Sequence, residues 1–216
     1  MAGGQRGGAS MSDAIQLLQA EMRACRQCVD AGYDVTPPAV VAGRLSAKMM
    51  TIGQAPGITE VEAKRPFNAG SGQRLFQWLA EAGIEEQWFR STQYMTAVTK
   101  CYPGRAKGGS GDRVPSRAEQ ALCHPFLARE IELVRPALII PIGKLAIELF
   151  YPRGMKLTEI IGTQKQVEAS WVVPLPHSSG ASRWHQTEEN RALIAQAVAL
   201  IGSHFRRLFP DGAQTL

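Results

Sequence analysis

Four cysteines are the side chains of this sequence with the clearest capacity for chemistry. Cys25 and Cys28 form a C-x-x-C pair just after an expected helix, whereas Cys101 and Cys123 are single and far downstream. Thiolates placed in this way can hold tetrahedral zinc or a 4Fe–4S cluster, and the spacing alone does not separate the two. The competing interpretation is a redox pair at 25 and 28 with two ordinary buried cysteines, but thioredoxin-like motifs follow a strand and this one follows a helix.

Polar loops rich in glycine and proline form a second set of candidate residues. They follow directly on apolar segments and have the sequences GQAPG (53–57), KCYPG (100–104), GK (143–144) and PHSSG (176–180). In open α/β sheets, ligands bind at the carboxyl ends of the strands. We therefore expect these loops to converge on one crevice.

The elements that must position these loops can be located from apolar periodicity. Buried strands are expected over residues 48–52, 94–99, 137–142 and 171–175. Helices are expected over residues 13–23, 72–82, 116–133, 144–150 and 188–208. This alternation predicts an α/β fold, with three α/β/α layers around a central four-stranded, mainly parallel sheet. We expect a flexible N-terminal tail over residues 1–11 and a single domain over residues 12–210.

The composition is that of a soluble globular protein with a basic balance. Among 216 residues, 24 Lys and Arg stand against 19 Asp and Glu, which gives a formal charge of +5. Such an excess suits a polyanionic partner through counterion release, although many basic proteins bind no nucleic acid. No apolar run approaches the roughly 18 residues of a membrane helix, and the Gly-rich start is no secretory signal. We expect a cytoplasmic protein, in which four cysteines bind metal more readily than they form disulfides.

Five short segments have the residues and spacing of known motifs. GQAPGITE at 53–60 resembles G-E-A-P-G followed by acidic residues, and RPF at 65–67 comes at the expected distance. TAVTKC at 96–101 resembles the strand motif T-N-x-V-K-C, and CHPFL at 123–127 resembles the start of a ligand-bearing helix. HSS at 177–179 stands in the place of H-P-S. In this combination the sequence resembles the iron–sulfur (family 4) uracil-DNA glycosylases of the uracil-DNA glycosylase superfamily.

The resemblance implies a DNA repair enzyme. Enzymes of that family flip uracil out of DNA and hydrolyse its N-glycosidic bond, which leaves an abasic site. For this chain it implies a monofunctional hydrolase with a structural 4Fe–4S cluster on Cys25, Cys28, Cys101 and Cys123, and zinc becomes a minor alternative. The implied partner is DNA that contains uracil or other deaminated bases, and a monomer is expected.

The resemblance also assigns roles to single residues. His177 is the expected hydrogen-bond donor to the departing base, and Gln54 and Glu60 occupy the catalytic positions of the first motif. The residues expected to bind the base or the DNA backbone are Gly53, Ala55, Pro56, Gly57, Phe67, Asn68, Ala97, Ser178, Ser179, Ser182 and Arg183. The basic residues of the loop after residue 99, which either contact DNA or are simply solvated, are Lys100, Arg105, Lys107 and Arg113.

Three departures from the family pattern bear on catalysis and specificity, and one of them is Ser178 in place of the proline of H-P-S. Gln54 stands where the family has Glu, and an amide can orient a water but cannot take its proton. Ala97 stands where the family has the Asn that reads the uracil edge, a task in which Asn68 can partly substitute. We therefore expect the enzyme to excise other deaminated bases as well as uracil. The alternatives are a non-catalytic or covalent binder of uracil-containing DNA, and a zinc-stabilised nucleic-acid-binding module without a base pocket.

Overall fold

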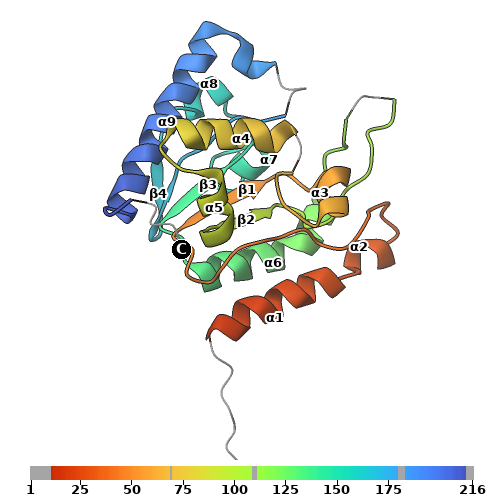
Figure 1. Ribbon diagram of the computed structural model, residues 1–216. Coiled ribbons are helices and arrows are strands. Elements are labelled where there is room, and N and C mark those ends of the chain that lie inside the picture. The colour runs from red at the N-terminus through yellow and green to blue at the C-terminus, as the bar shows by residue number, and fades with distance from the viewer. Residues whose placement is uncertain (1–10, 69, 109–110, 180–182, 213–216) are drawn as a thin grey trace, which may run out of the picture.

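The computed structural model describes residues 11–68, 70–108, 111–179 and 183–212, and Figure 1 shows a central sheet with helices on both faces. The strands are β1 (Met49–Gly53), β2 (Tyr94–Ala97), β3 (Leu138–Pro141), β4 (Lys165–Val167) and β5 (Ser170–Val172). Their order is β2-β1-β3-β5-β4, in which β4 alone runs antiparallel to its neighbour. The predicted α/β class and mainly parallel sheet are confirmed, but the sheet has five strands and not four.

The missed strand is β4, which forms a short hairpin with β5. Its residues, KQV, are only partly buried and lack the apolar run that marks the other strands. The predicted strand over 171–175 is assigned to Ser170–Val172, and its continuation still bonds to β3 through Val173 N–H to Ile139 O (3.0 Å) and Leu175 N–H to Pro141 O (3.0 Å).

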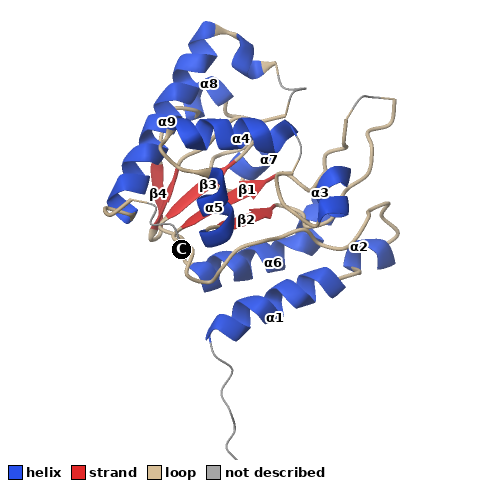
Figure 2. Cartoon of the chain, viewed as in Figure 1, coloured by secondary structure: helices blue, strands red, loops and turns tan. Residues whose placement is uncertain are grey.

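Four long helices build the outer layers (Figure 2). They are α1 (Met11–Ala24), α4 (Gly70–Glu81), α6 (Arg117–Val134) and α9 (Glu188–Leu208). The shorter helices are α2 (Gln27–Asp30), α3 (Ile58–Ala63), α5 (Glu86–Thr92), α7 (Lys144–Ile147), α8 (Leu157–Ile160) and the 3-10 turn η1 (Trp184–Gln186). Met11, expected in the tail, already belongs to α1, and residues 1–10 lie outside the described residues.

Two apolar cores lie on opposite faces of the sheet. Met49 belongs to the core on the face of the sheet that α4, α5 and α9 cover, whereas its neighbour Met50 belongs to the core on the face that α1 and α6 cover. Successive strand side chains point to opposite faces, so a strand covered on both sides reads as a continuous apolar run. This is why the pattern located β1, β2 and β3.

The outer edge of β2 is covered by an extended segment, residues 36–42. Ala42 exchanges two backbone hydrogen bonds with Met95 (3.1 and 2.7 Å), and Thr36 exchanges two with Tyr102 (2.8 and 3.3 Å). The segment therefore ties the region around Cys28 to the chain that follows β2. Within the described part of the chain, no helix is long and apolar enough to cross a membrane.

Candidate functional site

A cavity of about 500 Å³ opens at the carboxyl ends of the central strands. The predicted convergence of the loops after β1, β2, β3 and β5 is confirmed, since all four contribute to its lining. The expected residues that line it are Gly53, Gln54, Ala55, Pro56, Gly57, Glu60, Phe67, Ala97, His177, Ser178 and Ser179. Asn68 and Arg183 are exposed and not among its lining residues, and Ser182 lies outside the described residues. Thr96 and Asp112 also line the cavity but were not expected there.

His177 presents a defined tautomer to this cavity. The backbone N–H of Ser179 donates to its Nδ1 at 3.2 Å, so the neutral ring carries its proton on Nε2. Burial lowers the pKa of His177, which favours that neutral form. The ring packs against Gly143 (φ 82°), where a β-carbon would lie 2.9 Å from Cδ2 of His177. His177 is therefore a partly buried, uncharged N–H donor.

The loop that carries His177 is held from α4. Nη1 of Arg74 donates to the backbone carbonyls of Ser178 (3.4 Å) and Ser179 (3.0 Å). A guanidinium can serve two carbonyls at once because its N–H groups form a rigid fork. Arg74 thus fixes the backbone that orients His177.

Phe67 forms an aromatic wall at the end of β1. Its backbone has φ 51°, which is unusual for a residue with a side chain, and its ring lies 3.2 Å from where a β-carbon at Gly53 would be. Arg90 donates to the carbonyls of Pro66 (2.8 Å) and Phe67 (2.7 Å). Gly72 permits this geometry, since a β-carbon there would lie 1.9 Å from the Phe67 carbonyl oxygen.

Glu60, expected at a catalytic position of the first motif, is hydrogen-bonded to the backbone of that motif. Its Oε2 accepts a hydrogen bond from the N–H of Gly57 at 2.9 Å and caps α3, and the residue is 7% exposed. Asp112 lies nearby, because a β-carbon at Gly57 would be 2.6 Å from Glu60 Oε2 and 3.2 Å from Asp112 Oδ2. Two carboxylates therefore flank the first motif.

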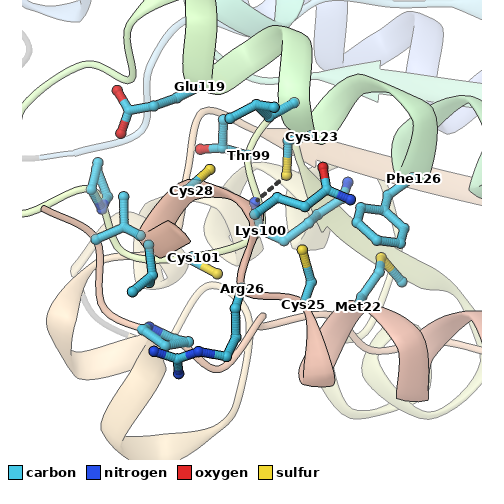
Figure 3. Close-up of a pocket in the computed structure, with 16 residues that line it drawn as sticks. Met22, Cys25, Arg26, Cys28, Thr99, Lys100, Cys101, Glu119, Cys123 and Phe126 are labelled. Atoms are coloured by element: carbon cyan, nitrogen blue, oxygen red, sulfur yellow. Dashed lines mark hydrogen bonds between the residues drawn. The ribbon is translucent and has the colours of Figure 1, made fainter. Parts of the chain in front are cut away.

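All four cysteines line the same second hollow, which lies beside α2 and the N-terminal half of α6 (Figure 3). All are free thiols, and the backbone N–H of Lys100 donates to Sγ of Cys123 at 3.3 Å. Burial, and then the neighbouring cysteines, raise the pKa of Cys101 to about 12. Among the described residues, no three Cys, His, Asp or Glu side chains form a group that could hold a single metal ion.

One polar side chain in this hollow lacks a partner. Thr99 is 6% exposed, and its buried hydroxyl makes no hydrogen bond. It lines the hollow together with the cysteines, as Figure 3 shows. A buried hydroxyl without an acceptor is costly in a folded protein, so this group points to an acceptor in the hollow.

Two basic residues that were candidate DNA contacts are committed to ion pairs instead. Nζ of Lys100 lies 2.6 Å from the carboxylate of Glu130, and their side chains are 2% and 0% exposed. Arg113 donates twice to Glu119 (2.7 and 2.6 Å). For Lys100 the DNA-contact interpretation is wrong, because a buried ammonium cannot reach a phosphate. Sequence gave no sign of this pairing, since Glu130 is 30 residues away in the chain.

Sequence comparison with known proteins identifies the family of this chain. Residues 40–201 match the uracil DNA glycosylase superfamily. The chain belongs to that superfamily. It is 27% identical over 195 residues to the type-4 uracil-DNA glycosylase of Thermotoga maritima, which covers 89% of this chain and 95% of that protein. It is 34% identical over 124 residues to the type-4 uracil-DNA glycosylase of Pyrobaculum aerophilum, and this match covers 56% of this chain and 58% of that protein. Within the superfamily, the chain therefore resembles the type-4 proteins.

Proposed function

We propose that this chain is a DNA repair glycosylase that flips uracil out of DNA and hydrolyses its N-glycosidic bond. One observation carries the proposal: a neutral imidazole N–H and an aromatic ring line the same cavity at the ends of β1 and β5. The names of the type-4 relatives support it. A base stacked within a duplex is out of reach of such a cavity, so the nucleotide must rotate into it.

The chemistry follows from the charge that develops when the bond breaks. Cleavage of the bond between C1′ and N1 leaves negative charge on the departing base, chiefly on its carbonyl oxygens. Nε2–H of His177 can donate to that charge, and it is fixed in place before the reaction. The Phe67 ring offers a stacking surface for the flipped base. Bond cleavage is thus assisted by stabilising the leaving group.

We expect one wall of the cavity to discriminate only weakly between bases. Ala97 has no polar side-chain group to read a base edge. The hydroxyl of its neighbour Thr96 is already bonded to Glu130 (2.9 Å) and Lys100 (2.8 Å). When a base other than uracil is bound, no polar side chain at this wall loses a hydrogen bond, so the wrong base is penalised only weakly. We infer that the chain also excises at least one other deaminated base, xanthine first.

The second hollow fits a 4Fe–4S cluster. Cluster sulfur atoms accept hydrogen bonds, and the unpartnered Thr99 hydroxyl is a donor without an acceptor in the same hollow. Cys25, Cys28, Cys101 and Cys123 would hold the group, one thiolate to each iron. Its contribution would be structural, because it would join α2, the end of β2 and α6. Zinc on the same thiolates is the alternative, and iron and sulfide analysis separates the two.

The test of the proposed activity uses labelled oligonucleotides that contain uracil, xanthine or hypoxanthine, as single strands and as duplexes. After incubation, alkali cleaves the strand wherever a base has been lost. We expect cleavage at uracil and at xanthine. Tight binding of uracil-containing DNA without cleavage would instead establish the binding protein that is our alternative, and an adduct that survives denaturation would identify a covalent one. We expect the active form to be a cytoplasmic monomer.

A further inference from the structure

The proposed reaction needs a group that can take a proton from the attacking water. Gln54 lines the cavity but cannot take one, because its amide is not a base. Two carboxylates line the cavity in the described part of the chain, Glu60 and Asp112.

Glu60 is already committed to holding the first motif. Its Oε2 accepts from the N–H of Gly57 (2.9 Å) and is within 3.4 Å of the hydroxyl of Thr59. The residue is buried, and it caps the first turn of α3. Protonating it would weaken the bonds that shape the GQAPG loop, so its role is to position that loop.

Asp112 is the more accessible of the two. Its side chain is exposed and lines the cavity, and Oδ2 lies close to Gly57, 3.2 Å from where a β-carbon there would be. Burial, and then the neighbouring carboxylate of Asp112, raise the pKa of Tyr102. The sugar of a flipped nucleotide stays joined to the DNA backbone outside the cavity, so an exposed carboxylate on the cavity wall can hold the water that attacks C1′.

Asp112 is also anchored although its loop is rich in glycine. Residues 104–106 pair with residues 111–113 beside α3, where the N–H of Arg113 donates to Gly104 O (3.0 Å) and that of Ala106 donates to Gly111 O (3.0 Å) (Figure 1). The Arg113 guanidinium is held by Glu119 and by the carbonyl of Asp34 (3.0 Å). The residue after Asp112 is therefore fixed to α6 and to the segment behind Cys28.

We propose that Asp112 orients and deprotonates the water that attacks the sugar, an inference that rests on the proposed glycosylase activity. The water proton passes to a carboxylate oxygen of Asp112 while the water oxygen forms a bond to C1′. The bond between C1′ and N1 breaks, and its electron pair leaves with the base. His177, which lines the same cavity, can donate to that developing charge.

The test compares Asp112→Asn with the wild type in single-turnover reactions on a uracil-containing duplex. The amide keeps the size of the side chain but removes the base, so the rate should fall by about a hundredfold or more, the usual scale for general-base catalysis. Affinity for the DNA should change less than about threefold, because phosphate contacts dominate it. Asp211→Asn, which changes an exposed carboxylate near the C-terminus, is the matched control.

Chemical rescue separates a catalytic role from a structural one. Formate should restore part of the rate to Asp112→Ala, because it can occupy the space and accept the proton, but it should not restore the rate of Asp112→Asn. An Asp112→Asn rate within threefold of an active wild type would overturn the proposal. So would an adduct that survives denaturation and requires Asp112, since the residue would then be a nucleophile. A wild type that releases no base would instead refute the glycosylase activity itself.

Discussion

The guanidinium of Arg90 bonds to the carbonyl oxygen of Phe67 at 2.7 Å and so holds the aromatic wall of the cavity in a left-handed backbone conformation. Such a conformation costs of order 1–3 kcal/mol and persists only where its surroundings enforce it. Arg90→Lys, which cannot serve two carbonyls in the same way, should lower the single-turnover rate on uracil by about tenfold. Arg65→Lys is the control, because Arg65 shares the Glu86 carboxylate (3.3 Å) without being bonded to Phe67. Equal losses in both variants would contradict this role.

His177→Ala should lower the single-turnover rate by about a hundredfold or more, the scale of losing one preorganised donor. Affinity for uracil-containing DNA, measured by fluorescence anisotropy, should stay close to that of the wild type. A variant that keeps a near-normal rate would show that another group serves the leaving base.

The charge state of His177 can be measured directly. Burial lowers its pKa, so the ring should stay neutral at pH 7, with the proton on Nε2, in nitrogen-15 NMR spectra. Since the folded pKa lies below the unfolded value of about 6.5, the unfolded chain binds this proton more readily. The contribution of His177 to stability is therefore complete above about pH 6.5 and is lost as the pH falls below it. A charged ring at pH 7 would contradict the assignment.

Ala97→Asn should narrow the range of excised bases. An added amide would be left unpaired by a base whose edge does not match it, so xanthine excision should fall more than uracil excision. The measurement is the ratio of single-turnover rates on the two duplexes at matched salt. A wild type confined to uracil would show that another residue reads the base.

Purified protein should be yellow-brown, with about four irons and four sulfides per chain. Cys123→Ala should bleach it and reduce its solubility, because a thiol that ties α6 to the end of β2 is lost. Stoichiometric zinc without iron in anaerobically prepared protein would refute the cluster.

The Thr99 hydroxyl gives a subtler test of the same hollow. Thr99→Val keeps the shape of the side chain and removes the unpartnered donor. Hydrogen bonds to the sulfur atoms of a cluster tune the reduction potential and the stability of that cluster. The variant should therefore keep its iron but bleach faster in air. Thr99→Ser should behave like the wild type. Equal bleaching rates would show that the hydroxyl does not face the cluster.

The sequence predicted those parts of the molecule that depend on local pattern. Continuous apolar runs located β1, β2 and β3, and the glycine- and proline-rich loops after them located the cavity. Ion pairs between residues far apart in the sequence could not be predicted from local pattern. Lys100 follows a strand and looks like a surface cation, yet Glu130 on α6 holds it in the interior. Asp112 carries no local signal either, and its neighbour Arg113 is held by Glu119 on α6.

The segment over residues 36–42 has a consequence for the behaviour of the protein in solution. It occupies the outer edge of β2, whose backbone groups would otherwise be free to pair with a strand of another molecule. At the opposite edge, β4 is three residues long and begins with Lys165, a short and charged strand of the kind that discourages such pairing. Both borders of the sheet are therefore protected against aggregation, and deletion of residues 36–42 would expose one of them.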